Sequence, residues 1–347
     1  MSLRDVGRAL DDWVAAGRTV AIATLVQARH SAPLPPGARF AVNDRGELEG
    51  SISNGCVEGD LYEHLRAIIS GAPASVLHYG ITDDMASDVG LTCGGEIDVL
   101  VELHDASSLA WSELLRAVRD GEPAVLVTGL SKHLRSRKLL VLENGSEGSL
   151  GERPFDDQVV ELARPYLESG GTDVVSLEAA SGRASDVFVE AHLPPPRLAI
   201  VGATSIGFAL CRIATLLGYQ VDVIDPRSAL ADPAKMPDAQ RVLHAWPDDG
   251  LGEIGLSPHV DVVVLTHDGK LDVPALASAL RAGCRYVGLL GGKRTQEHRR
   301  EALRGLGFDE TDLERIHGPV GLAIGSETPE EIALSIVAEL VETRRRS

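Results

Sequence analysis

Cys56 stands at the end of a polar, glycine-rich turn, a setting in which a thiol can do chemistry. The turn, residues 50–55, leads into residues 57–70, whose apolar residues recur at helical spacing. A helix N-terminus offers unpaired N–H groups and a positive dipole end, which favour a thiolate or an oxo-anion. The Glu58 carboxylate competes for the same helix end. The residues of this turn that we predict to handle a ligand are Cys56, Ser53 and Gly55.

A second cysteine, Cys93, occupies the glycine turn 92–96 ahead of a predicted strand at 97–103. We also expect Cys93 to handle ligand, but less strongly than Cys56, because a strand has almost no net dipole. Cys211 and Cys284 stand among apolar neighbours and are expected to be small core residues.

A third glycine turn, Gly202-Ala203-Thr204-Ser205-Ile206-Gly207, joins a short apolar run to a helical pattern. Asp225 ends the next apolar run, which is the order of a fold that binds dinucleotide phosphates at a helix N-terminus. Thr204 stands where the fingerprint has a second glycine, so we do not expect NAD(P) to be the cofactor. A scaffold with an altered or empty nucleotide site is the alternative. The predicted cofactor-binding residues of this region are Gly202, Thr204, Gly207 and Asp225.

Further polar residues follow other predicted strands, at the edge where an open parallel sheet binds its ligands. Arg227 follows the same strand as Asp225, His267 follows the next predicted strand, and Lys293 and Arg294 follow the one after that. Cationic groups that converge would clamp a phosphate. The alternatives are surface charges that balance nearby acids and, for His267, a structural hydrogen bond.

Three consecutive prolines divide the chain, because they resist both helix and central strand. We place a linker at 194–196, a first domain at 1–193 and a second domain at 197–347. In the second domain strand and helix patterns alternate, which predicts a parallel sheet covered by helices. The predicted strands are 197–201, 219–224, 260–266 and 284–290, and the predicted helices are 206–217, 273–282 and 294–306.

The last helix of the second domain has its own start signal. Thr328 and Glu331 form a capping box around Pro329, which suits the first helical position.

The first domain is less regular. Strand patterns occur at 20–27, 39–42, 97–103, 124–129, 139–142 and 186–190, and a helix at 57–70. The predicted fold class is therefore α/β, with an amino-terminal α/β or α+β domain followed by a Rossmann-like doubly wound parallel-sheet domain.

Length and composition limit the function classes. The 347 residues, 44% of them hydrophobic, predict two folded domains. A net charge of −18 and only 4% aromatic residues argue against a nucleic-acid partner. No signal-peptide pattern opens the sequence and no run of 18 apolar residues predicts a membrane span. The four cysteines lack CxxC spacing, so we expect a cytoplasmic protein with neither a membrane partner nor a zinc knot.

Six motifs together resemble the XdhC/CoxI family, and they span nearly the whole chain. They are Ser-Ala-Pro-Leu-Pro-Pro-Gly-Ala at 31–38, Gly-Ser-Ile-Ser-Asn-Gly-Cys-Val-Glu at 50–58, Leu-Thr-Cys-Gly-Gly-Glu-Ile-Asp at 91–98, Asp-Pro-Arg at 225–227, Gly-Leu-Leu-Gly-Gly-Lys-Arg at 288–294, and the segment 316–333 with its His-Gly-Pro-Val-Gly and Thr-Pro-Glu-Glu motifs. Two positions depart from the family pattern. Family members commonly have Gly-Ala-Gly-His at 202–205 and glycine at Asn54.

The resemblance implies a maturation factor and not a catalyst. Such a protein binds molybdenum cofactor, docks with a cysteine desulfurase that supplies the terminal sulfur ligand, and passes the cofactor to a molybdenum hydroxylase client of the xanthine dehydrogenase or carbon monoxide dehydrogenase type. The resemblance assigns Cys56 and Cys93 to cofactor handling, with Cys56 as a candidate contact to molybdenum. It assigns Gly202, Asp225, Arg227 and His267 to the Rossmann cleft.

The sequence leaves open the client enzyme, the pterin form of the cofactor and the oligomeric state. For the oligomeric state we expect a homodimer. The rival functions are an NAD(P)-dependent oxidoreductase and a cofactor-free module that recruits an acceptor enzyme.

Overall fold

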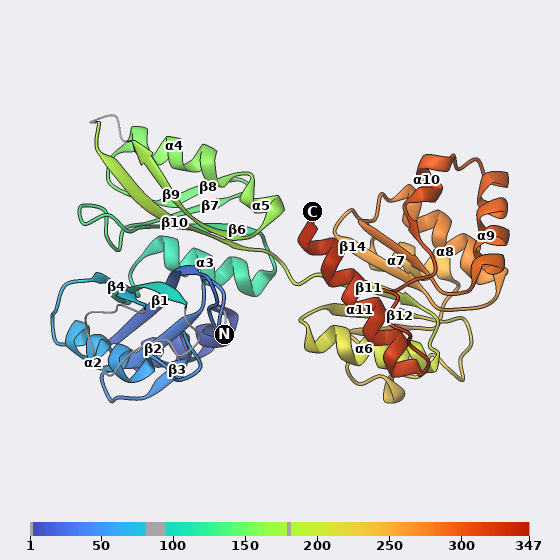
Figure 1. Ribbon diagram of the computed structural model, residues 1–347, viewed down its shortest axis with the longest axis horizontal. Coiled ribbons are helices and arrows are strands. Elements are labelled where there is room, and N and C mark those ends of the chain that lie inside the picture. The colour runs from blue at the N-terminus through green and yellow to red at the C-terminus, as the bar shows by residue number, and fades with distance from the viewer. Residues whose placement is uncertain (1–2, 81–94, 179–181, 347) are drawn as a thin grey trace. The chain divides into compact units, whose positions relative to one another are not determined.

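The chain folds into two compact units, Met1–Pro194 and Pro195–Ser347, and the seam falls within the three prolines (Figure 1). The structure is a computed structural model that describes residues 3–80, 95–178 and 182–346. Each unit is described by itself.

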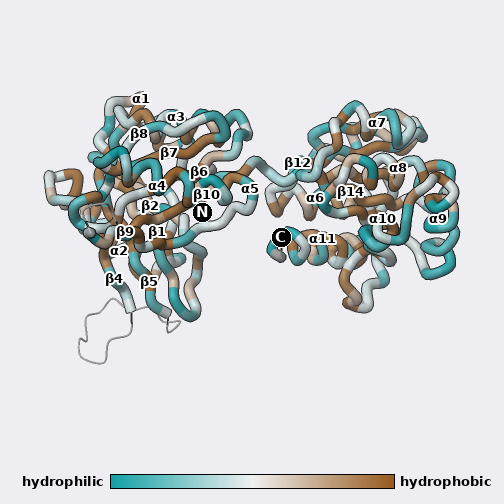
Figure 2. The backbone as a smooth tube through the Cα atoms, turned by 90° about the horizontal axis from the view of Figure 1, so that it is seen from above, coloured by the Kyte–Doolittle hydropathy of each residue, from teal (hydrophilic) through white to brown (hydrophobic). Residues whose placement is uncertain are grey.

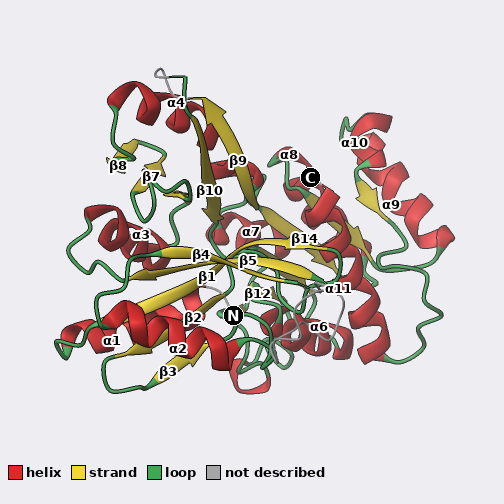
Figure 3. Cartoon of the chain, turned by 60° about the vertical axis from the view of Figure 1, so that its left-hand side comes forward, coloured by secondary structure: helices red, strands yellow, loops and turns green. Residues whose placement is uncertain are grey.

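Unit 1 contains two five-stranded antiparallel sheets. The first has the order β3-β2-β1-β5-β4 and the second has the order β8-β7-β6-β10-β9. In Figure 3, β9 and β10 are the two long strands that lie side by side in the second sheet. The first sheet comprises β1 (Val20–Arg29), β2 (Arg39–Asn43), β3 (Leu48–Gly50), β4 (Ser75–Tyr79) and β5 (Glu96–Leu103). The second comprises β6 (Ala124–Gly129), β7 (Lys138–Leu142), β8 (Gly145–Gly148), β9 (Thr172–Glu178) and β10 (Ala184–His192).

Helices cover the faces of these sheets. They are α1 (Leu3–Ala15), α2 (Glu58–Ile69), α3 (Leu109–Asp120), α4 (Arg153–Ala163) and the short α5 (Tyr166–Ser169). α2 buries Leu61, Leu65 and Ile68 on one face of the first sheet. On the other face, α1 and α3 share a core with strands of both sheets, and α4 packs on the second sheet. Full burial of a leucine or isoleucine contributes about 1.5–3 kcal/mol, so these apolar stripes hold the layers together.

One buried and one partly buried ion pair join the two sheets of unit 1. Arg39 of β2 donates to both carboxylate oxygens of Glu190 in β10, at 2.7 and 2.5 Å, and the two side chains are 2% and 6% exposed. Lys138 of β7 donates to Glu102 of β5 at 2.6 Å. Both cations also lie over the ring of Trp111 in α3. Each charge is therefore compensated by a partner from the opposite sheet.

Unit 2 has the predicted Rossmann-like architecture, and the predicted fold class is confirmed. Six strands form a parallel sheet in the order β13-β12-β11-β14-β15-β16. The strands are β11 (Arg197–Val201), β12 (Gln220–Ile224), β13 (Arg241–Leu243), β14 (Val260–Val264), β15 (Tyr286–Leu289) and β16 (Ile316–His317). The helices are α6 (Ser205–Leu216), η1 (Pro233–Lys235), α7 (Pro247–Ile254), α8 (Gly269–Arg281), α9 (Lys293–Gly305), α10 (Glu310–Glu314) and α11 (Pro329–Arg346).

Helices lie on both faces of this sheet because its strands alternate their side chains between two cores. Ala199 and Val201 of β11 join α7, α8 and α9 in one core, whereas Leu198 and Ile200 join α6 and α11 in the other. Figure 1 shows α11 in red beside α6 in yellow. In Figure 2 the exposed helix α9 is mostly teal, whereas the inner strands are brown.

The start of α11 confirms the predicted capping box. The Glu331 N–H donates to the Thr328 hydroxyl at 3.3 Å, and the Thr328 N–H donates to the Glu331 carboxylate at 3.1 Å. Within the described residues, every helix is too short or too polar to cross a lipid bilayer.

Candidate functional site

Glu58 organises the glycine turn that carries Cys56. Its Oε1 accepts from the Ser51 hydroxyl at 2.6 Å and from the N–H groups of Ile52 and Ser53 at 3.0 and 2.7 Å. Its Oε2 accepts from the Ser53 hydroxyl at 2.6 Å and from the Gly55 N–H at 2.8 Å. The first residue of α2 therefore holds the turn that precedes the helix.

These hydrogen bonds change the acidity of Glu58. Burial alone would raise its pKa, but the hydroxyl donors Ser51 and Ser53 and the backbone donors of the turn outweigh burial. The pKa of Glu58 is lowered from 4.5 to about 2. The carboxylate is thus the anion that occupies this turn at neutral pH.

The occupied turn corrects one sequence-based expectation. We expected unpaired N–H groups beside Cys56, whereas those of residues 52, 53, 55 and 57 donate to Glu58. Cys56 itself is half-buried and packs against the core that α2 shares with the first sheet. Asn54 has a φ of +57°, a left-handed conformation that asparagine tolerates better than most residues, so the turn keeps its shape without glycine there.

The other cysteines divide into two cases. Cys93 lies outside the described residues. Cys211 and Cys284 are both 1% exposed, as predicted for core residues, and burial raises the pKa of each thiol to about 11. No cluster of three His, Cys, Asp or Glu side chains that could hold a metal ion occurs in the described residues.

The Gly202 turn of unit 2 brings β11 close to its neighbours. Gly202 has a φ of +116°, and a Cβ there would lie 2.9 Å from the Thr266 methyl group. A Cβ on Gly207 would overlap the Gly202 carbonyl, so both glycines allow α6 to start directly against the strand. Thr204 is the N-cap of α6, and its hydroxyl accepts from the Gly207 N–H at 3.2 Å. The threonine in the second glycine position therefore has a capping role.

The Asp225 carboxylate accepts hydrogen bonds from neighbouring groups of unit 2. Its carboxylate is fully buried and accepts from the Ala203 N–H at 2.8 Å, from the Arg227 N–H at 2.9 Å, and from the Arg227 guanidinium at 2.8 and 2.7 Å. Burial alone would raise the pKa of Asp225, but the donors from Arg227 and Ala203 lower it. Asp225 is thus fixed between the first two strand ends of the sheet.

A pocket of about 560 Å³ lies at the carboxyl ends of the strands in unit 2. It brings together three of the predicted residues, Thr204, Arg227 and His267. Asp225 and the two glycines shape its wall from behind, because they hold the Arg227 and Thr204 turns. Lys293 and Arg294 are exposed at the start of α9 and are not among the residues that line this pocket. The other lining residues are Pro226, Trp246, Leu265, Thr266, Asp268 and Leu271.

Trp246 is the aromatic residue among the pocket residues that sequence reasoning did not predict. It follows β13, precedes the helix-starting Pro247, and is 52% exposed. An aromatic residue three positions after a short edge strand was the available signal. The strand has only three residues, which is why the pattern did not stand out.

A buried network holds the loop that carries His267. The Thr266 hydroxyl donates to Asp272, and Arg299 donates to the other carboxylate oxygen of Asp272 at 2.8 Å. Arg299 also donates to the His267 carbonyl at 3.2 Å. Burial raises the pKa of Asp272, against the opposing effect of these donors. The His267 side chain is exposed at the pocket while its backbone is fixed.

A second network fixes the segment 316–321. Glu339 of α11 accepts from the Tyr286 hydroxyl at 2.6 Å and from the Gly321 N–H at 2.7 Å, and it contacts His317 Nδ1 at 2.9 Å. These contacts tie the His-Gly-Pro-Val-Gly motif to the last helix. The motif therefore has a structural role at the far edge of the sheet.

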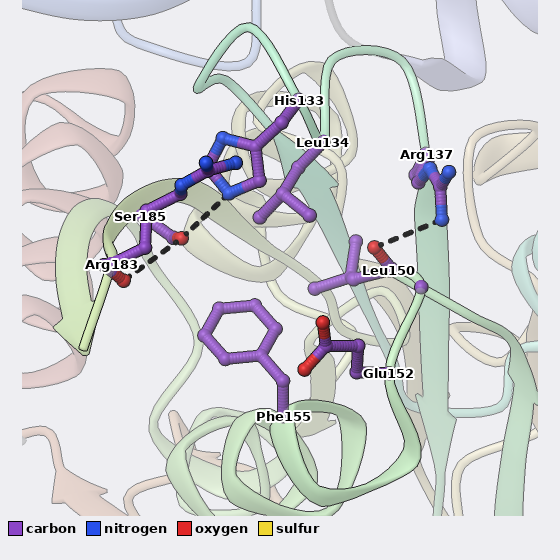
Figure 4. Close-up of a pocket in the computed structure, with 9 residues that line it drawn as sticks. His133, Leu134, Arg137, Leu150, Glu152, Phe155, Arg183 and Ser185 are labelled. Atoms are coloured by element: carbon purple, nitrogen blue, oxygen red, sulfur yellow. Dashed lines mark hydrogen bonds between the residues drawn. The ribbon is translucent and has the colours of Figure 1, made fainter. Parts of the chain in front are cut away.

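Unit 1 contains a separate pocket of about 260 Å³ (Figure 4). Its floor is apolar, with Leu134, Leu150 and Phe155 buried. Figure 4 shows His133 bonded to Ser185 on one side, at 3.1 Å, and Arg137 bonded to the Leu150 carbonyl on the other, at 3.4 Å. These bonds connect the β6–β7 turn to β10 and to the loop before α4, and none of the predicted site residues lines this pocket.

Comparison with known families gives two matches. Residues 198–340 match the family described as the XdhC Rossmann domain, and residues 13–80 match the XdhC and CoxI family. Both regions carry motifs of the sites described above.

Similar proteins cover almost the whole chain. A probable xanthine dehydrogenase subunit from Bacillus subtilis is 29% identical over 94% of this chain and 93% of its own length. The molybdenum cofactor insertion chaperone PaoD from Escherichia coli is 25% identical over 94% of this chain and 84% of its own. A crystal structure of a xanthine dehydrogenase from Bacillus halodurans is 25% identical, with a TM-score of 0.76, and the match covers 100% of this chain and 96% of that one.

Proposed function

This chain belongs to the XdhC and CoxI family, and we propose that it is a maturation factor that binds molybdenum cofactor and helps to insert it into a molybdenum hydroxylase. The observation that carries the proposal is the similarity to a cofactor insertion chaperone over 94% of the chain. The relative named as a xanthine dehydrogenase subunit supports the same class of client.

The pocket of unit 2 has groups that suit one end of this cargo. Molybdenum cofactor carries at least one phosphate, which calls for a helix N-terminus or a guanidinium. The first turn of α6 and the Arg227 side chain both stand at this pocket. Asp225 fixes the Arg227 guanidinium through two hydrogen bonds, so the cation is held in one orientation before cargo arrives.

The finer parts of the function are proposals on the same basis. Cys56 is the candidate soft ligand toward the molybdenum end, because a thiol is partly accessible there. Docking with a cysteine desulfurase, sulfuration of the cargo and action as a homodimer complete the proposed role. In this role the chain holds and transfers cargo, and turns over no substrate.

Anaerobic purification from a molybdenum-replete host tests the proposal. Molybdenum and pterin are measured in the purified protein, for the wild type, for Arg227→Ala and for Arg212→Ala. Arg212 is a matched control, because its side chain is 79% exposed on α6 and does not line the pocket. We expect the wild type and Arg212→Ala to retain pterin and metal and Arg227→Ala to retain at least roughly tenfold less. A wild-type protein that carries neither, in a host that makes the cofactor, would refute the proposal.

The Rossmann turn favours a second candidate, an oxidoreductase that uses NAD(P). The engaged Asp225 argues against it, because its carboxylate already accepts four hydrogen bonds from its own unit. Calorimetric titration with NADH and NADPH separates the two. Micromolar binding of NADH or NADPH, followed by turnover of a substrate, would favour the oxidoreductase over the maturation factor.

A further inference from the structure

Trp246 lines the pocket of unit 2 with about half of its side chain exposed. Its backbone is the N-cap of α7, and its side chain makes no capping bond. The helix behind it is tightly seated, because Pro247 is buried and a Cβ on Gly250 would lie 2.7 Å from Ile224. A rigid backbone therefore presents a half-exposed aromatic ring at the pocket.

A hydrogen bond joins the loop that carries Arg227 to the loop that carries Trp246. His244 Nε2 donates to the Pro226 carbonyl at 2.9 Å, which ties the loop after β13 to the loop after β12. The guanidinium of Arg227 is held by Asp225 and is 49% exposed. An indole and a fixed guanidinium thus stand on adjacent strand ends and line one pocket.

The strand order of the sheet fixes the order of four residues along the pocket. Trp246 follows β13, Arg227 follows β12, Thr204 follows β11 and His267 follows β14. Neighbouring strands lie about 4.8 Å apart, so these four strand ends span about 14 Å. The aromatic end and the end with the α6 N-terminus are therefore separated parts of one pocket.

We propose that this pocket binds a nucleoside 5′-phosphate, with the base against Trp246 and the phosphate toward Arg227 and the first turn of α6. Every nucleobase has a face that stacks on an aromatic ring, and a guanidinium and a helix N-terminus both suit a phosphate. Resting on the proposed function, this means that the cargo is the nucleotide-bearing form of the pterin cofactor rather than the mononucleotide form.

The engaged Asp225 gives the site a distinguishing property. In a dinucleotide fold, the acid at this position accepts from the ribose 2′-hydroxyl. Here the Asp225 side chain is fully buried and holds Ala203 and Arg227. We therefore expect the base and the phosphate to determine the affinity, and the ribose 2′-hydroxyl to have almost no effect on it.

The first experiment is calorimetric titration of the full chain with CMP, dCMP, GMP and inorganic phosphate. We expect CMP and dCMP to bind within about twofold of each other and both to bind more tightly than phosphate. Trp246→Ala should weaken the nucleotides by roughly tenfold, Trp246→Phe by less than threefold, and neither should change phosphate binding. Leu216→Ala, whose side chain is 86% exposed on α6, is the control and should bind as the wild type does. Equal binding of phosphate and CMP, or unchanged binding by Trp246→Ala, would overturn the inference.

The second experiment identifies the source of the nucleotide. The wild type and Trp246→Ala are titrated with pterin mononucleotide, pterin dinucleotide and NAD. We expect dinucleotide to exceed mononucleotide at least tenfold in the wild type, and that preference to disappear in Trp246→Ala. If both pterin forms bind equally in both proteins, the proposed function stands and this inference falls. If CMP binding depends on Trp246 but neither pterin form binds, the nucleoside site stands and the proposed function falls. A preference for NAD over both pterins overturns the assignment to the cargo.

Discussion

Asp225 and Arg227 form a two-bonded ion pair although they are only two residues apart. Arg227 Nε lies 2.8 Å from one carboxylate oxygen and Nη2 lies 2.7 Å from the other. The acid is 0% exposed and the cation 49% exposed, so the pair spans the wall of the pocket from its core to its surface. The ligand-facing group at this strand end is therefore the cation.

Removing the charge of Asp225 should destabilise the turn that forms this wall of the pocket. We expect Asp225→Asn to lower the free energy of unfolding by about 1–3 kcal/mol, because an amide cannot accept all the donors now aimed at the carboxylate. Urea unfolding followed by circular dichroism measures the change. Asp238→Asn, at an exposed acid 3.9 Å from Arg212, should leave the midpoint unchanged. A midpoint for Asp225→Asn equal to the wild type would show that the pair does not hold the turn.

The Glu58 turn should make stability depend on pH. The folded pKa of about 2 lies below the ordinary 4.5, so the stabilisation is complete above about pH 5 and is lost as pH falls toward 2. Glu58→Gln should cost about 1–2 kcal/mol at pH 7, and the difference from the wild type should shrink by pH 3. Denaturant unfolding at pH 7, 5 and 3 measures it. Glu63→Gln, at an exposed position of the same helix, is the control. A difference that is independent of pH would exclude the carboxylate as its cause.

The cysteines should separate by reactivity and by function. In a Cys93→Ser background, a thiol reagent should modify half-buried Cys56 at least about 100-fold faster than Cys211 and Cys284, which react only when the fold opens. Mass spectrometry of the alkylated protein follows the order. For retention of cofactor we expect Cys56→Ser to be the most damaging change, Cys93→Ser the next, and the other two to act only through stability. Wild-type retention and client activation by a folded Cys56→Ser variant would leave the turn as a structural feature.

Breaking the Arg39–Glu190 pair should destabilise the fold more than replacing both residues by apolar ones. Arg39 and His192 keep the pKa of Glu190 below its ordinary value although burial alone would raise it. Glu190→Gln should lower the free energy of unfolding by about 3–5 kcal/mol, because it leaves Arg39 buried without a counter-charge. The double change Arg39→Met, Glu190→Leu should recover a part of that loss. Glu161→Gln, on a side chain 81% exposed, is the control. Equal stability of the single and double variants would contradict this account.

Local signals in the sequence predicted most of unit 2, but they missed the short elements β13, β16, α7 and α10. The strand and helix patterns, the Gly202 turn and the Thr328 capping box depend on residues close in sequence, and the structure has all of them. The sequence showed only in part how side chains serve their own chain. The competition of Glu58 for the helix end was expected, and the structure extends it to donors of the whole turn. Asp225 was expected to bind a ligand and instead satisfies donors of its own chain.

Unit 1 was harder to predict for a physical reason. Its two antiparallel sheets are assembled from strands far apart in sequence, as when β1 pairs with β5 across α2. The ion pairs between the sheets join residues such as Lys138 and Glu102 that have no local relationship. Hydrophobic alternation finds a strand, but nothing local selects its partner.

The Arg39–Glu190 pair also sets a waiting time during synthesis. The two residues are 151 positions apart, so at roughly 5–20 residues per second the ribosome needs about 8–30 s to supply the second after the first. Until then the guanidinium of Arg39 lacks the Glu190 carboxylate that neutralises it. Because burying an unpaired charge is unfavourable, this face of the first sheet stays exposed to water. Nascent chains arrested before Glu190 should therefore remain open to protease at β2, and chains arrested far enough beyond it should close. Assembly of unit 1 is thus timed by the translation of its last strand.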